Sequence, residues 1–292
     1  MAITVKEARA AAEQYREEGY AVIRQFVDGD VLERLRRETA AIYEAGMQHP
    51  RTWRHGNLCF EVLPEEDFGR RYVIQAYWMS WISAFFEEFR RSEGYLTLLE
   101  PILGPSIRQV AQQIHWKPPG AGLTGYRFHQ DLRFREAREA YRDVVGATVN
   151  TGLAIDPSTL ENGCLQVVPG SHRRCYLGLS DDGDGQIMKG LTAEEELRGV
   201  GIDPGDVMAL EMEPGDIALW GLLTVHGSLP NASKQDRAFA ISSYVRAADS
   251  DRGEWAFRDG ISTPLGERPQ LCKWEKLHER PEPHYVDAKW YA

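Results

Sequence analysis

Tyr126-Arg127-Phe128-His129-Gln130-Asp131 places a histidine and an aspartate two positions apart in the chain. In an extended segment, residues i and i+2 point to the same side, so the His129 imidazole and the Asp131 carboxylate can meet at one ion. A second histidine would complete a set of two histidines and one carboxylate. Such a set binds Fe(II) on one face and leaves the other face open. The pair alone is weak evidence, because a chain with 8 histidines can contain it by chance.

The composition is that of an ordinary globular protein, with 292 residues, 42% hydrophobic and 27% charged. That length allows one large domain or two small ones, and β-barrels and sandwiches often reach it as one domain. The net charge of -10 argues against nucleic acid or an acidic membrane as a partner. The N-terminus lacks the apolar core of a signal peptide, and no run approaches the roughly 18 apolar residues of a membrane helix.

We therefore expect a cytoplasmic protein with no membrane, nucleic-acid or protein partner indicated by the sequence. The chain ends in Lys289-Trp290-Tyr291-Ala292, which does not indicate peroxisomal import. The four cysteines are widely spaced and contain no C-x-x-C pair, so we expect reduced thiols and neither a zinc ribbon nor a disulfide framework. They are Cys59, Cys164, Cys175 and Cys272.

The first hundred residues indicate helices around an irregular segment. Thr4-Val5-Lys6-Glu7 has the pattern of a capping box, which begins a helix that Gly19 should end. A second helix should begin at Asp28 or Asp30 and end at Gly46.

Residues 47–78 lack a regular pattern and are rich in charges and aromatic rings, which favours a lid or pocket wall over a plain surface loop. Residues 79–100 suit a helix with aromatic side chains facing the core. Residues 1–104 are therefore expected to supply helical support and a lid.

From Ser106 the pattern changes to short strands separated by turn signals such as Asn162-Gly163 and Pro214-Gly215-Asp216. About eight such strands predict a mainly β protein with flanking helices, built as a sandwich or a double-sheet jelly roll. We expect a single domain over 1–292, with the jelly-roll core at 105–248 and a C-terminal tail at 249–292. A βαβ alternation, a G-x-G-x-x-G and a P-loop are missing, which argues against a Rossmann fold.

The partner histidine is expected late in this sheet. Residues 222–228 form a near-continuous apolar strand ending in His226-Gly227-Ser228, where the histidine is either a satisfied core group or a ligand. Arg237 begins the next apolar strand after a hairpin-type connection, so antiparallel pairing would set it near His226 and Ser228. An arginine inside a barrel needs an anionic partner, and its planar guanidinium matches a carboxylate. These residues predict a metal beside a site for a small carboxylic acid.

Several further segments appear in a characteristic order. They are Lys117-Pro118-Pro119-Gly120, Phe128-His129-Gln130-Asp131, Glu161-Asn162-Gly163-Cys164-Leu165, Val168-Pro169-Gly170-Ser171-His172, Pro214-Gly215-Asp216, and His226-Gly227-Ser228 followed by Arg237. This set resembles the phytanoyl-CoA dioxygenase-like family of Fe(II)- and 2-oxoglutarate-dependent oxygenases. The likeness covers about residues 10–45 and 105–246.

The resemblance implies a double-stranded β-helix (jelly-roll, cupin-like) core and the cofactors Fe(II), 2-oxoglutarate and O2. It implies His129, Asp131 and His226 as catalytic metal ligands, with Arg237 and Ser228 holding the distal carboxylate of 2-oxoglutarate. Because related halogenating enzymes lack the carboxylate, halogenation is not expected. Further co-substrate contacts, undecided without the inward face of each strand, are Gln112 or Gln113 and Asn150 or Thr151.

The expected reaction is hydroxylation of an unactivated C–H bond of a small metabolite, with release of succinate and CO2. The expected setting is secondary metabolism. Desaturation, cyclisation or endoperoxidation by the same cofactors stays open, as does a non-catalytic jelly-roll binding protein. Arginines beside the first ligands could bind an anionic substrate, although such a charge run is usually a solvated face. The candidate substrate contacts are Arg127, Arg133, Trp78 and His115.

Overall fold

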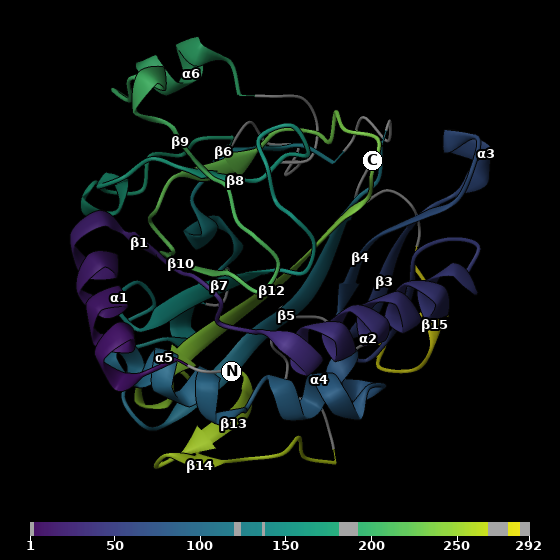
Figure 1. Ribbon diagram of the computed structural model, residues 1–292, viewed down its shortest axis with the longest axis horizontal. Coiled ribbons are helices and arrows are strands. Elements are labelled where there is room, and N and C mark those ends of the chain that lie inside the picture. Colours follow the sequence, from purple (N-terminus) through teal and green to yellow (C-terminus); the bar gives the residue numbers. More distant parts are fainter. Residues whose placement is uncertain (1–2, 120–123, 136–137, 181–191, 268–279, 287–292) are drawn as a thin grey trace.

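The computed structural model describes residues 3–119, 124–135, 138–180, 192–267 and 280–286. Within these residues, two antiparallel sheets of eleven and four strands form the body of the molecule (Figure 1). The path of the large sheet is β1 (Tyr20–Ile23), β10 (Ile217–Gly221), β7 (Thr148–Ala154), β12 (Arg237–Arg246), β5 (Ile107–Lys117), β4 (Tyr72–Tyr77), β3 (Leu58–Leu63), β2 (Trp53–His55) and β15 (His284–Tyr285). Beside β5 lie β13 (Glu254–Arg258) and β14 (Ile261–Ser262).

The small sheet has the order β6 (Tyr126–His129), β11 (His226–Ser228), β8 (Leu165–Val167) and β9 (Met208–Leu210). The α-helices are α1 (Val5–Glu18), α2 (Gly29–Met47), α3 (Glu65–Phe68), α4 (Ala84–Phe89), α5 (Glu93–Leu103) and α6 (Glu194–Gly199). The 3-10 helices are η1 (Met79–Trp81), η2 (Asp131–Phe134), η3 (Arg138–Ala140), η4 (Ser171–Arg173), η5 (Pro204–Asp206) and η6 (Ala247–Asp249).

Two apolar layers lie on opposite faces of the large sheet. One layer packs sheet residues such as Ile114 and Leu153 against helix residues such as Leu35 and Leu98. Figure 1 shows α1, α2, α4 and α5 along this face. The other layer, which includes Trp220 of the large sheet, joins it to β8 and β9. The predicted jelly-roll core with flanking helices is therefore confirmed.

The first helix forms as the capping pattern predicts. The Thr4 side chain accepts from the Glu7 N–H, the Glu7 carboxylate accepts from the Thr4 N–H, and Gly19 ends α1 in the left-handed region at φ 81°. Asp28 is the N-cap of α2, although its side chain makes no capping bond.

Gly46 does not end α2, which runs on to Met47, so that prediction is wrong. A Cβ at Gly46 would lie 2.8 Å from Val73 Cγ2 and 3.0 Å from Phe60 Cδ1. The glycine therefore allows the helix to approach β3 and β4 closely, which a sequence reading for helix ends does not detect.

The expectation that residues 47–78 are irregular is also wrong. They contain β2, β3 and β4, which extend the large sheet from β5. Every residue of β3 and β4 is buried, so neither strand shows the alternation that marks a strand with one exposed face. The single helix expected at 79–100 is divided into η1, α4 and α5, with Ser83 and Ser92 at the two helix starts.

The strand expected at 222–228 is short. Only His226–Ser228 is extended, and a turn precedes it, in which the Thr224 N–H donates to the Gly221 carbonyl at 3.1 Å. Arg237 lies opposite Lys117 in the β12–β5 pair, whereas His226 belongs to the small sheet. The expected pairing of Arg237 with His226 and Ser228 is therefore wrong.

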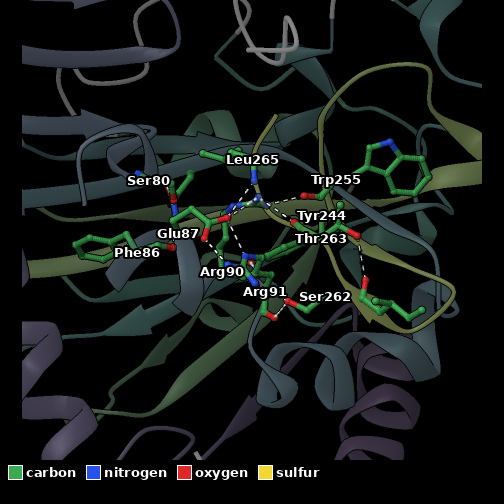
Figure 2. A network of polar contacts seen from close by, with 12 residues as sticks. Ser80, Phe86, Glu87, Arg90, Arg91, Tyr244, Trp255, Ser262, Thr263 and Leu265 are labelled. Atoms are coloured by element: carbon green, nitrogen blue, oxygen red, sulfur yellow. Dashed lines mark hydrogen bonds and ion pairs between the residues drawn. The ribbon is translucent and has the colours of Figure 1, made fainter. Parts of the chain in front are cut away.

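The tail is tied to the first hundred residues by a buried arginine (Figure 2). The Arg90 guanidinium donates to the Trp255 carbonyl at 2.9 Å and to the Thr263 carbonyl at 3.4 Å. Glu87, which pairs with Arg91 at 2.6 Å, accepts from the Leu265 N–H at 3.1 Å. The large sheet also includes strands from both 1–104 and 249–292. The domain boundaries themselves stay a prediction.

Among the described residues, no disulfide joins Cys59, Cys164 and Cys175, of which the first two are buried and the third is exposed. Cys272, Gly120 and residues 289–292 lie outside the described residues. Among the helices of the described ranges, none has the length and apolar character needed to cross a bilayer.

Candidate active site

The predicted histidines meet across the β6–β11 pair, where His129 lies directly opposite His226. Asp131 follows β6 by two residues and begins η2. One carboxylate oxygen of Asp131, Oδ1, lies 3.3 Å from His129 Nε2, and the other, Oδ2, lies 3.4 Å from His226 Nε2. One potential ligand atom from each residue lies within 4.8 Å of the others. The structure thus brings together the three side chains that sequence reasoning selected.

Backbone carbonyls orient both imidazole rings. His129 Nδ1 lies 2.7 Å from the Arg127 carbonyl, and His226 Nδ1 lies 2.8 Å from the Thr224 carbonyl. Because a carbonyl only accepts, each Nδ1 carries a proton, so Nε2 is the nitrogen of each ring that could bind a metal. Such a hydrogen bond from the far ring nitrogen is what fixes the tautomer and orientation of metal-binding histidines.

Two donors hold the Asp131 carboxylate. The Asn150 amide donates to Oδ2 at 2.6 Å, and the Trp220 indole donates to the same oxygen at 3.0 Å. Oδ2 is therefore engaged within the protein, which leaves Oδ1 for an ion. The four strands β6, β7, β10 and β11 and the residues next to them together fix the carboxylate and both rings.

The charges of this cluster suit a divalent metal. Burial opposes ionisation of Asp131, but His226, His129 and Arg135 hold the pKa of its carboxyl below the usual value. Burial lowers the pKa of His226 to about 4, although the charge of Asp131 acts to raise it. At neutral pH the site therefore offers an ionised carboxylate and a neutral His226, the forms that bind metal. The donor set of two imidazole nitrogens and one carboxylate oxygen fits Fe(II).

Two buried cations lie side by side near this cluster. Arg237 and Lys117 are opposite one another in the β12–β5 pair, and their residues are 3% and 1% exposed. Burial lowers the pKa of Arg237 to about 10. Burial and the Arg237 charge hold the pKa of Lys117 well below its usual value.

The partners of these two cations are neutral oxygens. Lys117 Nζ donates to Ser228 Oγ at 2.6 Å, to the Leu229 carbonyl at 2.6 Å and to the Gly163 carbonyl at 3.1 Å. Arg237 also donates to the Gly163 carbonyl, and its Nε has no hydrogen-bond partner within the described ranges. Among the described residues, neither side chain has a carboxylate as a hydrogen-bond partner, although Asp156 acts on the Arg237 charge from a distance. Buried cationic groups held only by neutral oxygens are costly, so the arrangement suits an anion from outside the chain. Sequence reasoning missed Lys117, although a lysine ending a mostly buried strand was a signal.

The structure shows which face of β5 and β7 points inward. Gln112 is held on the helix side, where its carbonyl accepts from Ser80 N at 3.0 Å and from Ser80 Oγ at 2.7 Å. Gln113 lies on the opposite face and contacts His115 Nε2 at 2.7 Å. On β7, the Asn150 side chain points to Asp131 and therefore also lies on the interior face.

Thr151 follows Asn150 in β7 and points to the opposite face of the strand, the helix side. Its hydroxyl donates to the Ser242 carbonyl at 3.3 Å and hydrogen-bonds to Tyr95 of α5. Gln112 and Thr151 are therefore directed away from the metal cluster, while Gln113 and Asn150 face the interior.

The four candidate substrate contacts have different surroundings. Arg127 forms an ion pair with Glu196 of α6 at 2.7 Å. Trp78 is 2% exposed and packs in an apolar cluster with Cys59 and Tyr77. The Arg133 guanidinium lies 5.5 Å from the centre of the Phe134 ring.

His115 belongs to an interior polar network that sequence reasoning did not foresee. Its Nδ1 lies 2.8 Å from the Tyr126 hydroxyl, which also accepts from Gln75 Nε2 at 2.7 Å. Tyr77 extends the network by donating to Glu61 at 2.8 Å. Phe134 was missed as well, and its ring packs edge-on against His129 with centroids 5.8 Å apart.

The sequence model of the phytanoyl-CoA dioxygenase (PhyH) family matches residues 15–239, which is more than half of the chain. The chain belongs to the phytanoyl-CoA dioxygenase family. It is 26% identical over 234 residues to the dioxygenase lolE1 of Epichloe uncinata, covering 80% of each protein. It is 29% identical over 178 residues to the methylphosphonate hydroxylase of Gimesia maris, covering 59% of this chain and 60% of that protein.

The fold of this family member matches that of EctD from S. alaskensis, solved with 2-oxoglutarate and 5-hydroxyectoine, with a TM-score of 0.63. The match has 16% identity and covers 94% of this chain and 87% of that one. As a phytanoyl-CoA dioxygenase family member with a converging His–Asp–His cluster, the protein is an Fe(II)- and 2-oxoglutarate-dependent dioxygenase. Its cofactors are Fe(II) and 2-oxoglutarate.

Proposed function

We propose that this dioxygenase hydroxylates an unactivated C–H bond of a small-molecule metabolite while 2-oxoglutarate is converted to succinate and CO2. The observation that carries the proposal is that β11 links the His129–Asp131–His226 cluster to the buried Lys117–Arg237 pair, because Ser228, two residues after His226, accepts from Lys117. A metal-binding triad and a site for a dicarboxylate are the two parts that this chemistry needs. The methylphosphonate hydroxylase among the relatives, named for a small molecule, supports a substrate of that size.

The residues divide the work as follows. His129, His226 and Asp131 Oδ1 would hold the iron, while Asn150 and Trp220 keep Asp131 in place. Bound Fe(II), with 2-oxoglutarate and O2, supplies the oxidising power that breaks the C–H bond.

Anchoring of the co-substrate would fall to the buried cations. Lys117 and Arg237 would bind the distal carboxylate of 2-oxoglutarate, and the Ser228 hydroxyl, which accepts from Lys117, would complete the site. The surrounding apolar layer, which includes Trp220 and Phe239, limits the access of water.

Desaturation, cyclisation or endoperoxidation by the same cofactors is the alternative. The ligand set is common to all of these outcomes, because the product depends on which substrate hydrogen is presented to the iron. The mass of the product separates them, since hydroxylation adds one oxygen atom and desaturation removes two hydrogens. A cytoplasmic location and the absence of nucleic-acid, membrane or protein partners stay predictions.

An anaerobic titration of the metal-free protein with Fe(II) and 2-oxoglutarate tests the site. We expect a visible charge-transfer band of the chelate that saturates with both components. Asp131→Ala should remove the band. Arg237→Ala should keep iron binding and raise the concentration of 2-oxoglutarate needed for half saturation. A folded wild-type protein without the band would refute the ligand assignment, and wild-type 2-oxoglutarate affinity in Arg237→Ala would refute the anchor.

A further inference from the structure

A second cationic group lies close to the metal cluster and differs from the Lys117–Arg237 pair. Arg135 directly follows η2, the short helix that begins with Asp131. Its Nη2 donates to Ser243 Oγ of β12 at 2.9 Å. The residue is half-buried, and its Nε is buried without a hydrogen-bond partner in the part of the chain that the structure describes.

The register of the large sheet places this arginine on the interior side. Ser243 lies directly opposite Asn150 in the β12–β7 pair, and Asn150 donates to Asp131. The charge of Arg135 acts on the same carboxylate. Arg237 begins β12 six residues before Ser243, which corresponds to about 20 Å along an extended strand. The two cationic groups therefore reach the interior at separate points along one strand.

Two other arginines, Arg127 and Arg142, differ from Arg135 in the partners that they have. Arg127 has Glu196 as an acidic partner at 2.7 Å, and Arg142 has Asp251 at 2.8 Å. The hydrogen-bond partner of the Arg135 guanidinium is a neutral hydroxyl. Asp131 is already committed to Asn150, Trp220 and the two histidines. A half-buried guanidinium whose Nε has no hydrogen-bond partner among the described residues, beside a reaction site, suits an anion that arrives with the substrate.

We propose that Arg135, supported by Ser243, binds an oxyanion group of the substrate, either a carboxylate or a phosphonate, and so holds the adjoining C–H bond beside the metal site. This inference rests on the proposed function and narrows it to anionic small molecules. Arg135 would act as a positioning and specificity residue, separate from the cations that anchor 2-oxoglutarate.

The test uses the full-length enzyme, anaerobic and loaded with Fe(II) and saturating 2-oxoglutarate, so that the Lys117–Arg237 site is already filled. The probes are propionate, its neutral isostere propionamide, and methylphosphonate. Their dissociation constants are read from the change that each probe causes in the visible chelate band. Arg135→Ala, Arg135→Lys and Ser243→Ala are compared with Arg142→Ala, which removes a nearby exposed arginine.

We expect an anionic probe to bind the wild-type complex at least about tenfold more tightly than propionamide, because only the anion gains charge-assisted hydrogen bonds. Arg135→Ala should lose about tenfold in anion affinity, with the dissociation constant of 2-oxoglutarate unchanged. Arg135→Lys should keep part of the affinity, Ser243→Ala should lose less, and Arg142→Ala should match wild type. Tighter binding of methylphosphonate than of propionate would identify a phosphonate site, and the reverse a carboxylate site.

Three results would overturn the inference: no preference for the anions over propionamide in the wild type, full anion affinity in Arg135→Ala, or loss of the chelate band in the Arg135 variants. The last would show that Arg135 serves the metal site itself. Absence of the chelate band in the wild type, before any probe is added, would instead refute the proposed function.

Discussion

At the scale of single residues, the proposed site depends on polar groups that are only partly hydrogen-bonded within the protein. Asp131 Oδ2 is held by Asn150 and Trp220, so the other oxygen is left for an ion. Lys117 and Arg237 are buried with neutral hydrogen-bond partners, which is what the proposed 2-oxoglutarate anchor requires. In both cases part of the group is hydrogen-bonded within the protein, and the remainder would bind the ion or the co-substrate under the proposed function.

Replacement of Lys117 by methionine should affect stability and co-substrate binding differently. Lys117→Met removes a buried group that is costly to charge, but it also removes three hydrogen bonds, so the thermal unfolding temperature of the cofactor-free protein should change little. The affinity for 2-oxoglutarate should fall by about tenfold, because one charge-assisted contact is lost. Titration and a melting curve on the same sample check both. A lower melting temperature with unchanged 2-oxoglutarate affinity would make Lys117 a structural residue.

The metal-free protein should lose stability as the pH falls from about 6.5 towards 4. The pKa of His226 is lowered by burial from 6.5 to about 4. Between these pH values the histidine is protonated in the unfolded chain but not in the native site, so a fall in pH favours unfolding. Unfolding by urea at several pH values measures the effect, and His226→Gln should flatten the dependence. If the variant kept the wild-type slope between these pH values, another group would be responsible.

At the scale of elements, β2, β3 and β4 extend the large sheet and bring the Gln75–Tyr126–His115 network to the interior. They can do so because α2 lies close above them. Gly46 has no Cβ at the contact with Val73 and Phe60, where one would lie at 2.8 and 3.0 Å.

Gly46→Ala should therefore destabilise the protein by about 1–3 kcal/mol, since the added methyl group must displace packed side chains. Gly199→Ala in α6 is the matched control, because a Cβ there meets no atom within 4 Å. Urea unfolding of both variants gives the comparison. Equal stabilities for the two would show that α2 and the sheet can separate without cost.

At the scale of the whole molecule, the tail and the first hundred residues belong to one packed unit with the jelly roll. β13 pairs with β5, and Arg90 joins α4 to Trp255 and Thr263 (Figure 2). Phe257 of β13 is 1% exposed within the main apolar core.

Phe257→Ala should cost about 3–5 kcal/mol and should leave a single unfolding transition, because a large core side chain is removed from a shared core. Ile261→Ala, in the same tail but 71% exposed, should be nearly neutral. Differential scanning calorimetry measures both. Two separate transitions in Phe257→Ala would show that the tail unfolds independently.

Local rules in the sequence determined a substantial part of this protein. The capping box at Thr4, the turn signals between the strands and the spacing of His129 and Asp131 each depend on residues a few positions apart, so they can be predicted from the chain alone. The ordered motifs extended this to the family, the jelly-roll fold and the cofactors, and they selected His226 and Arg237 for roles that stay predictions.

Only the tertiary structure decided which distant residues meet. β3 and β4 are buried on both faces and show no alternation, and Arg237 pairs with Lys117 and not with His226. On β5, the consecutive residues Gln112 and Gln113 point to opposite faces, Gln112 to the helix side and Gln113 to the interior. The physical reason is that strand pairing joins residues far apart in the chain. Its register follows from packing and hydrogen bonding of the whole sheet, which no short stretch of sequence contains.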